Sequence, residues 1–139
     1  TDKLFYGLRG VQMGKLLAAL SDDDYRAVPE PSFSADGKRA VTAHADGWAR
    51  IWETATGTLL HELEAHKGVP VRAVAFHPNG RWVATVVASD ARVWDVESAR
   101  VVAELRGHGS LVNSVAFSPD GKWAVTAGDD GTARVWQAP

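Results

Sequence analysis

The sequence predicts an all-β protein made of about three successive units, each containing four short antiparallel strands. Trp52, Trp94 and Trp136 recur at intervals of 42 residues, and each ends a segment Ala-Arg-(Ile or Val)-Trp. The segments between turns are rich in Val, Ala, Thr, Trp and Phe and partly alternate apolar with polar residues, which favours strands over helices. Asp-Gly and Asn-Gly pairs separate the segments, and such pairs favour two-residue hairpins because the central residues need positive φ.

The expected elements follow in order along the chain. An outer strand at 14–20 precedes three units, whose strands we place at 27–33, 38–44, 48–52 and 57–63, then at 71–76, 81–87, 91–95 and 100–105, and finally at 112–117, 122–127 and 132–136. Residues 1–13 are either a decayed strand or an extension. Four strands with a period near 42 residues are typical of a β-propeller blade. Because one blade cannot bury both faces of its sheet, the blades at 27–63, 71–105 and 112–136 must stack face to face.

Two prolines test this placement. Pro29 and Pro31 both fall in the first strand of the first blade, and a proline has no N–H to donate to a neighbouring strand. The first strand of a blade is an edge that faces the central channel, and residues two apart share one side of a strand. Both positions can therefore point their missing donor toward the channel, and the placement stands.

The third unit resembles the WD-repeat family most fully. It combines Gly107-His108 before its first strand with VAFSPDG at 115–121 and DGTARVW at 130–136. The second unit contains Trp94-Asp95, the dipeptide that names the family. With three units in register, the resemblance covers residues 14–139.

The resemblance implies a structural hydrogen-bond network in each blade, formed by His, Ser or Thr, Asp and Trp. The matching residues are His108, Thr126, Asp130 and Trp136 in the third unit, His66, Thr85 and Trp94 in the second, and Thr42, Asp46 and Trp52 in the first. Asp90 lies four residues before its tryptophan instead of six, so we do not expect it to take the aspartate role. Asp23 stands where the first unit needs its histidine, so that network should be broken or altered.

The family's propellers usually close with seven blades, and sometimes with six or eight, which leaves two alternatives for this chain. The chain starts at Thr1 instead of Met and stops before a fourth strand of the third unit. It is then either a fragment of a larger ring or a half-ring. In the second case residues 14–20 would complete the third blade of another copy, by a two-fold closed arrangement.

Composition excludes several classes of function. The net charge is −2, which argues against a nucleic-acid partner because such domains carry a basic excess. No apolar run approaches the ~20 residues of a membrane span, so we expect no membrane association. The chain has no cysteine, which suits the cytoplasm, and its five histidines lack zinc spacing, so we expect neither a metal site nor a cofactor.

Some residues of the third unit could indicate either a catalytic role or a scaffold role. His108, a hydroxyl and Asp130 resemble a hydrolase triad, but the family's structural network accounts for the same residues, and no Gly-x-Ser-x-Gly is present. The acidic run Asp22-Asp23-Asp24 lacks the alternation of a calcium loop and is more simply a solvated loop. We therefore expect a non-catalytic scaffold for protein–protein interaction. The alternative is a docking or sensing segment of a larger bacterial signalling enzyme, such as a kinase, protease or NTPase fusion.

The resemblance also implies a binding face for a protein or peptide partner. In the family, the loops that lead into the first strand of each blade and the hairpin before the Trp strand are the usual contacts. Projected onto this chain, these positions are Ala27, Pro29, Pro70, Arg72, Leu111 and Asn113 in the loops, and Ala45, Ser89 and Asp129 in the hairpins. Trp48 has no equivalent tryptophan in the other units and is added as an exposed aromatic contact, whereas Trp82 and Trp123 share one position and are expected to pack between blades.

Overall fold

The computed structural model describes residues 29–139 and contains three antiparallel sheets that follow one another along the chain. The first sheet comprises β1 (Ser32–Phe33), β2 (Arg39–Ala43), β3 (Trp48–Glu53) and β4 (Leu59–Glu64). The second comprises β5 (Ala73–Phe76), β6 (Trp82–Val87), β7 (Asp90–Asp95) and β8 (Arg100–Leu105). The third contains β9 (Val112–Phe117), β10 (Trp123–Gly128) and β11 (Ala133–Gln137). The predicted all-β fold of propeller blades, about three per chain, is confirmed. The predicted strand at 14–20 and the segment 1–13 lie outside the described residues.

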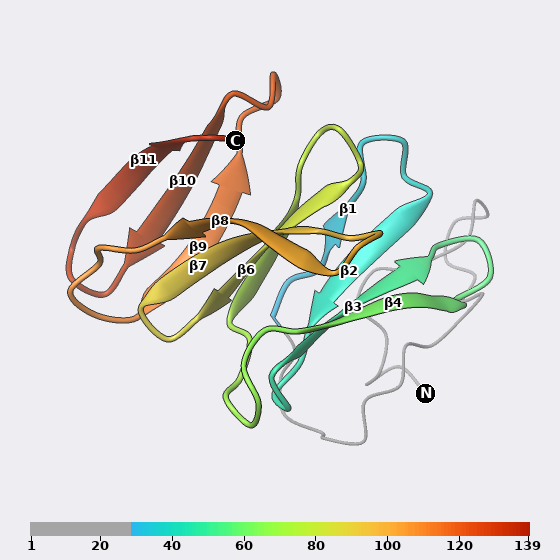
Figure 1. The fold of residues 1–139 in the computed structure, drawn as a ribbon, viewed down its shortest axis with the longest axis horizontal. Coiled ribbons are helices and arrows are strands. Elements are labelled where there is room, and N and C mark those ends of the chain that lie inside the picture. Colours follow the sequence, from blue (N-terminus) through green and yellow to red (C-terminus); the bar gives the residue numbers. More distant parts are fainter. Residues whose placement is uncertain (1–28) are drawn as a thin grey trace.

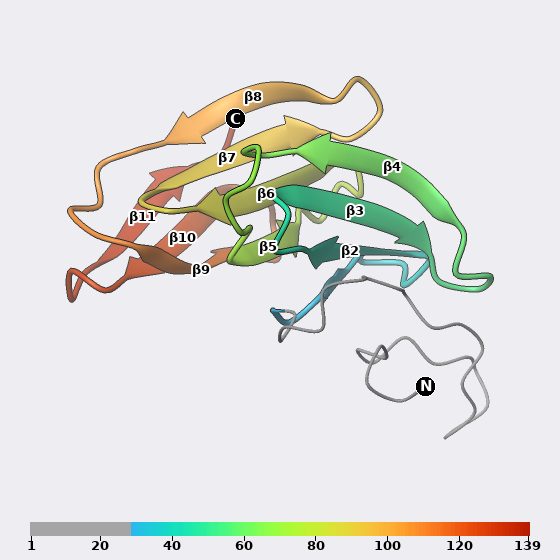
Figure 2. The ribbon, with the colours of Figure 1, turned by 90° about the horizontal axis from the view of Figure 1, so that it is seen from below.

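The second sheet lies between the other two (Figure 1). Each sheet has its strands in sequence order, so neighbours along the chain are also neighbours in the sheet. Figure 2 shows the outer strands β4 and β8 on one side of the molecule and the inner strands β5 and β9 toward the opposite side. The inner strands approach one another across the sheets, with β5 in contact with both β1 and β9. This is the arrangement of blades around part of a propeller axis.

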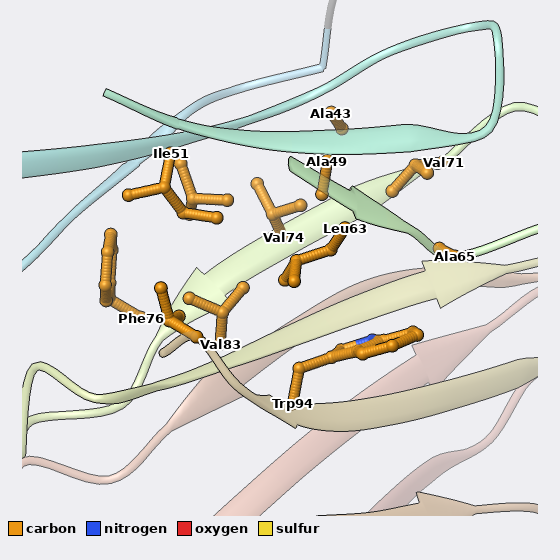
Figure 3. Packing of buried hydrophobic residues seen from close by; sticks show 12 residues of the cluster. Ala43, Ala49, Ile51, Leu63, Ala65, Val71, Val74, Phe76, Val83 and Trp94 are labelled. Atoms are coloured by element: carbon orange, nitrogen blue, oxygen red, sulfur yellow. The ribbon is translucent and has the colours of Figure 1, made fainter. Parts of the chain in front are cut away.

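Two hydrophobic cores fill the spaces between the sheets. The first joins the first and second sheets and contains Val41, Ile51, Leu63, Val83 and Trp94 (Figure 3). The second joins the second and third sheets and contains Ala84, Val93, Leu105 and Val115. Alternate residues of the middle strands point into opposite cores, since Val83 and Ala84 belong to different clusters. The second blade is therefore buried on both faces, as the stacking argument requires.

The first inner strand is shorter than the predicted range 27–33. Within the described residues it is formed only by Ser32 and Phe33, which pair with Val41 and Ala40. Pro29 and Pro31 precede it without regular pairing, because neither can donate a backbone hydrogen bond.

The glycine turns are longer than the two-residue hairpins expected from the sequence. Gly37 closes a turn by donating to the Ser34 carbonyl at 2.9 Å and has a φ of 72°. Gly47 and Gly131 likewise end three-residue hairpin loops with positive φ, in the arrangement of a turn followed by a left-handed glycine. The two-residue hairpin occurs instead between β6 and β7, where Ala88 has a φ of 52°.

Candidate interaction face and blade networks

One end of the molecule collects the hairpins before the Trp strands and the loops that lead into the inner strands. The Val71 N–H donates to the His44 carbonyl at 3.0 Å, which ties the loop before β5 to the hairpin of the first sheet. The Val112 N–H donates to the Ala88 carbonyl at 2.9 Å, and the Asp129 N–H donates to the Leu111 carbonyl at 2.8 Å. We call this end the hairpin face, comprising residues 44–48, 65–72, 88–89, 106–113 and 128–131.

A row of polar side chains crosses the hairpin face between the second and third blades. Arg72 Nη2 donates to Asn113 Oδ1 at 2.9 Å, and the Asn113 side-chain amide donates to Asp129 Oδ1. All three residues are exposed, although they come from two different blades. The sequence predicts each of them on a binding face, and the structure brings the three side chains into contact in a single polar row. We call Arg72, Asn113 and Asp129 the polar row.

A hollow of about 460 Å³ lies beside the polar row, among the inner strands. Arg72 and Asn113 line it together with Pro29 and Pro31. The prolines thus border the space that corresponds to the central channel, where their missing N–H groups leave no strand partner unsatisfied.

The other predicted contact residues are distributed unevenly over this face. Ala27 lies outside the described residues, Pro70 and Leu111 are exposed, and Pro29, Ala45, Trp48 and Ser89 are half-buried. Trp48 is therefore not the fully exposed aromatic side chain that the sequence predicts. Trp123 is 46% exposed, whereas Trp82 packs edge-on against His77. The two tryptophans differ because the third blade flanks the second, and no further blade flanks the third within residues 29–139.

The third blade contains a continuous hydrogen-bond network. Trp136 Nε1 donates to Thr126 Oγ1 at 2.9 Å, and His108 Nε2 lies 2.7 Å from the same oxygen. His108 Nδ1 lies 3.1 Å from Asp130 Oδ2. The Thr132 hydroxyl and the Gly109 N–H also donate to this carboxylate and hold the pKa of Asp130 well below its ordinary value. The network ties the loop before β9 to the two middle strands of its blade.

The first blade builds the same contact with a histidine that the sequence argument missed. Trp52 Nε1 donates to Thr42 Oγ1 at 2.8 Å, and His44 Nε2 lies 2.6 Å from that oxygen. His44 is 2% exposed and follows Thr42 by two residues, so the two side chains share one side of the strand. The spacing of two residues between Thr42 and His44 is the sequence feature from which this contact could have been predicted. The Asp46 carboxylate accepts from the Trp48 N–H and from Arg50.

The second blade has no imidazole at the equivalent place. Trp94 Nε1 donates to Thr85 Oγ1 at 2.9 Å, as in the other blades. His66, which was expected to contact Thr85, is exposed, and its Nδ1 lies 3.4 Å from the Lys67 carbonyl. A cavity of about 170 Å³ lies between the two, lined by His66 and Thr85 among others.

Comparison with known proteins agrees with this geometry. The sequence model described as "WD domain, G-beta repeat" matches residues 57–95 and 99–137. The chain belongs to the WD-repeat family. Each matched segment begins near the outer strand of one blade and ends on the Trp strand of the next, so the WD repeat is offset from the blade by one strand.

Similar proteins include three with curated names. The small ribosomal subunit protein RACK1y of Oryza sativa subsp. japonica is 28% identical over 111 residues, covering 75% of this chain and 32% of the relative. Cross-pathway control WD-repeat protein 2 of Flammulina velutipes is 37% identical over 75 residues, covering 54% of this chain and 23% of the relative. The U3 small nucleolar RNA-associated protein 21 homolog of Schizosaccharomyces pombe is 33% identical over 99 residues, covering 71% and 11%. The WD-repeat chain spans about a third or less of the length of these relatives.

The described part of the chain contains neither a metal-binding cluster nor a membrane-spanning helix. Across residues 29–139, no group of three His, Asp or Glu side chains is placed to hold a metal ion. In the same part of the chain, no helix has the length and apolar composition needed to cross a bilayer.

Proposed function

We propose that this WD-repeat segment is a non-catalytic scaffold that presents its hairpin face to a protein or peptide partner. The polar row carries the proposal, because it joins two blades and places a cationic and an anionic side chain on the exposed surface. Side chains held on packed sheets lose little conformational entropy on binding. The hollow of about 460 Å³ beside the row offers room for a side chain of the partner.

A non-catalytic role is supported by the surroundings of the hydroxyl that resembles a nucleophile. Thr126 is fully buried and its oxygen already accepts from Trp136. An attacking hydroxyl must reach a substrate carbonyl beside oxyanion donors, and Thr126 faces a packed blade. The His108–Asp130 contact supports the blade and does not activate an accessible nucleophile. A cytoplasmic location is part of the proposal, because a chain without cysteine suits a reducing compartment.

The peptide-binding role is tested with a displayed peptide library. Peptides selected on the 139-residue chain are measured by fluorescence anisotropy against Arg72→Ala and Asn113→Ala. We expect both substitutions to weaken binding, each by roughly three- to thirtyfold, since they remove exposed polar anchors. Arg100→Ala is the matched control, because Arg100 is exposed at the start of β8, outside the hairpin face. Equal affinity for all variants would refute the proposed face.

We also propose that the open side of the third blade is covered by another WD-repeat sheet, in a second copy or in the remainder of a larger propeller. Trp123, Val125 and Val135 are 46%, 39% and 66% exposed there. Large apolar side chains in one patch favour an interface. Light scattering with size-exclusion chromatography tests the second copy, since a dimer has twice the mass of the 14.9 kDa chain. Monomers that resist association at high concentration would refute the self-pairing.

A further inference from the structure

The three blades differ at one point of their otherwise shared network. In each blade a tryptophan indole donates to a threonine oxygen, at 2.8, 2.9 and 2.9 Å. In the first and third blades an imidazole nitrogen lies 2.6 or 2.7 Å from that same oxygen. The two rings arrive from different places, since His44 belongs to the hairpin of its own blade and His108 to the loop before β9. The Trp–Thr pair therefore offers an imidazole-binding geometry that two unrelated histidines satisfy.

In the second blade the corresponding position is a cavity of about 170 Å³. Thr85 lies at its base and is 2% exposed, and Asp90 and Arg92 form part of its wall. Two features of the neighbouring loops leave this cavity unfilled. The β6–β7 hairpin has only two residues between Val87 and Asp90, and the His66 side chain lies at the exposed margin.

The hydroxyl at the base of the cavity keeps an unused donor. Thr85 Oγ1 accepts from Trp94 Nε1. Within residues 29–139, the Trp94 indole is the only hydrogen-bond partner of the Thr85 hydroxyl. A buried hydroxyl gains by donating as well as accepting. A neutral imidazole nitrogen would accept this proton, as the geometry at Thr126 and His108 allows.

The size and the polarity of the cavity suit the same group. A cavity of about 150 Å³ accommodates a benzene ring, so one of about 170 Å³ holds a five-membered ring. Asp90 also lines the cavity, so it is the acidic residue available to accept from the second ring nitrogen of a bound imidazole, although its spacing from Trp94 differs from that of Asp130 from Trp136. Arg92 is engaged elsewhere, because its Nη1 donates to the Ala65 carbonyl at 3.3 Å and its Nε lies 3.8 Å from Glu104. The free polar groups therefore favour an imidazole over an anion.

We propose that this cavity is a binding site for an imidazole ring, supplied by a histidine side chain of the partner. The inferred histidine rests on the proposed scaffold function, since it assigns one chemical group to the partner. The Thr85 hydroxyl donates to one ring nitrogen, and the Asp90 carboxylate accepts from the other. The cavity opens on the hairpin face, so a partner loop seated there can reach it.

The test uses imidazole and the peptide Gly-His-Gly as probes on the 139-residue chain. Binding is followed through the indole N–H resonances of Trp94, Trp52 and Trp136 by ¹H–¹⁵N NMR. We expect both probes to shift the Trp94 resonance in a saturable manner and to leave the other two unchanged. Thr85→Val should weaken imidazole binding by roughly three- to tenfold, the effect of losing one hydrogen bond. Thr85→Ser retains the hydroxyl and should retain binding.

Two further variants separate the remaining outcomes. Thr126→Val is the matched control, because it makes the same change in the third blade and should leave the Trp94 response intact. His66→Ala should bind imidazole at least as well as the unmodified chain. Binding by His66→Ala alone would overturn the proposal, because it would show that the chain's own His66 fills the cavity. The proposal would also be overturned if the Trp94 resonance shifted neither in the unmodified chain nor in His66→Ala. This test follows the Trp94 resonance with a small probe, whereas the scaffold function is tested by peptide binding to Arg72→Ala and Asn113→Ala. A failure of one test can therefore be distinguished from a failure of the other.

Discussion

His44 Nε2 lies 2.6 Å from Thr42 Oγ1 inside the first blade, and His44 is 2% exposed. Thr42 also accepts from the Trp52 indole at 2.8 Å. A histidine of the blade's own hairpin therefore supplies the contact that His108 makes from a preceding loop in the third blade. The first and third blades therefore contain the same buried contact between a histidine and a threonine, although the two histidines come from different segments of the blade.

Replacing His44 should destabilise the protein, whereas replacing His66 should not. His44→Ala removes a buried partner of Thr42, and losing such a hydrogen bond inside a core costs about 1–3 kcal/mol. His66→Ala is the matched control, because His66 is exposed and should change the unfolding free energy by less than about 0.5 kcal/mol. Urea unfolding followed by tryptophan fluorescence measures both. Equal losses would show that the His44 contact contributes nothing specific.

Asp130 should make stability depend on acid pH. The Thr132 hydroxyl and the Gly109 N–H lower the pKa of this carboxyl below its ordinary 3.8. A group with a lowered folded pKa contributes its full stability above the ordinary pKa and loses it as the pH falls toward the folded value. The stability difference between the unmodified chain and Asp130→Asn should thus be constant above about pH 5 and shrink below about pH 4.

Thr132→Val gives an independent check on the same carboxyl. The Thr132 hydroxyl lies 2.6 Å from Asp130 Oδ1, and it makes the largest contribution to the lowered pKa. Without it, the pKa of Asp130 should rise toward 3.8. The acid unfolding midpoint, measured by circular dichroism, should therefore move to higher pH than in the unmodified chain. An unchanged midpoint would show that Asp130 does not govern acid unfolding.

Gly47 should tolerate alanine less well than Gly37 does. Both have positive φ, at 94° and 72°, so alanine is strained at either position. A Cβ at Gly47 would overlap the His66 carbonyl oxygen, whereas a Cβ at Gly37 meets nothing within 4 Å. We expect Gly37→Ala to cost about 1 kcal/mol and Gly47→Ala to cost clearly more. Thermal unfolding of the two variants measures the difference, and the reverse order would contradict the observed loop packing.

The core between the first two blades should depend on Ile51. This side chain is fully buried between the sheets, so Ile51→Ala should cost about 2–5 kcal/mol of unfolding free energy. Leu59→Ala is the control, because Leu59 is 41% exposed on β4 and its truncation should have a much smaller effect. Denaturant titration of both proteins provides the comparison. Similar losses would mean that the sheets do not stack through this core.

Much of the fold could be predicted because its determinants are local. Tryptophans at intervals of 42 residues, glycine turns and β-branched segments specify consecutive antiparallel strands, and neighbours in sequence became neighbours in each sheet. Even so, the loops at Gly37 and Gly47 are longer than a two-residue hairpin, because the glycine adopts positive φ after the turn instead of within it.

The candidate site could likewise be predicted only in part: the sequence indicates which residues belong to it, but not how all of their side chains are arranged in space. The sequence by itself determined the WD-repeat blades, the Trp–Thr pairs and the surface that carries Arg72, Asn113 and Asp129. Only the tertiary structure decided that His44 replaces the missing histidine of the first blade, and that His66 leaves a cavity beside Thr85. The reason is physical. Strand pairing follows from residues a few positions apart, whereas the direction of a loop side chain depends on the backbone path and on the space that packed neighbours leave.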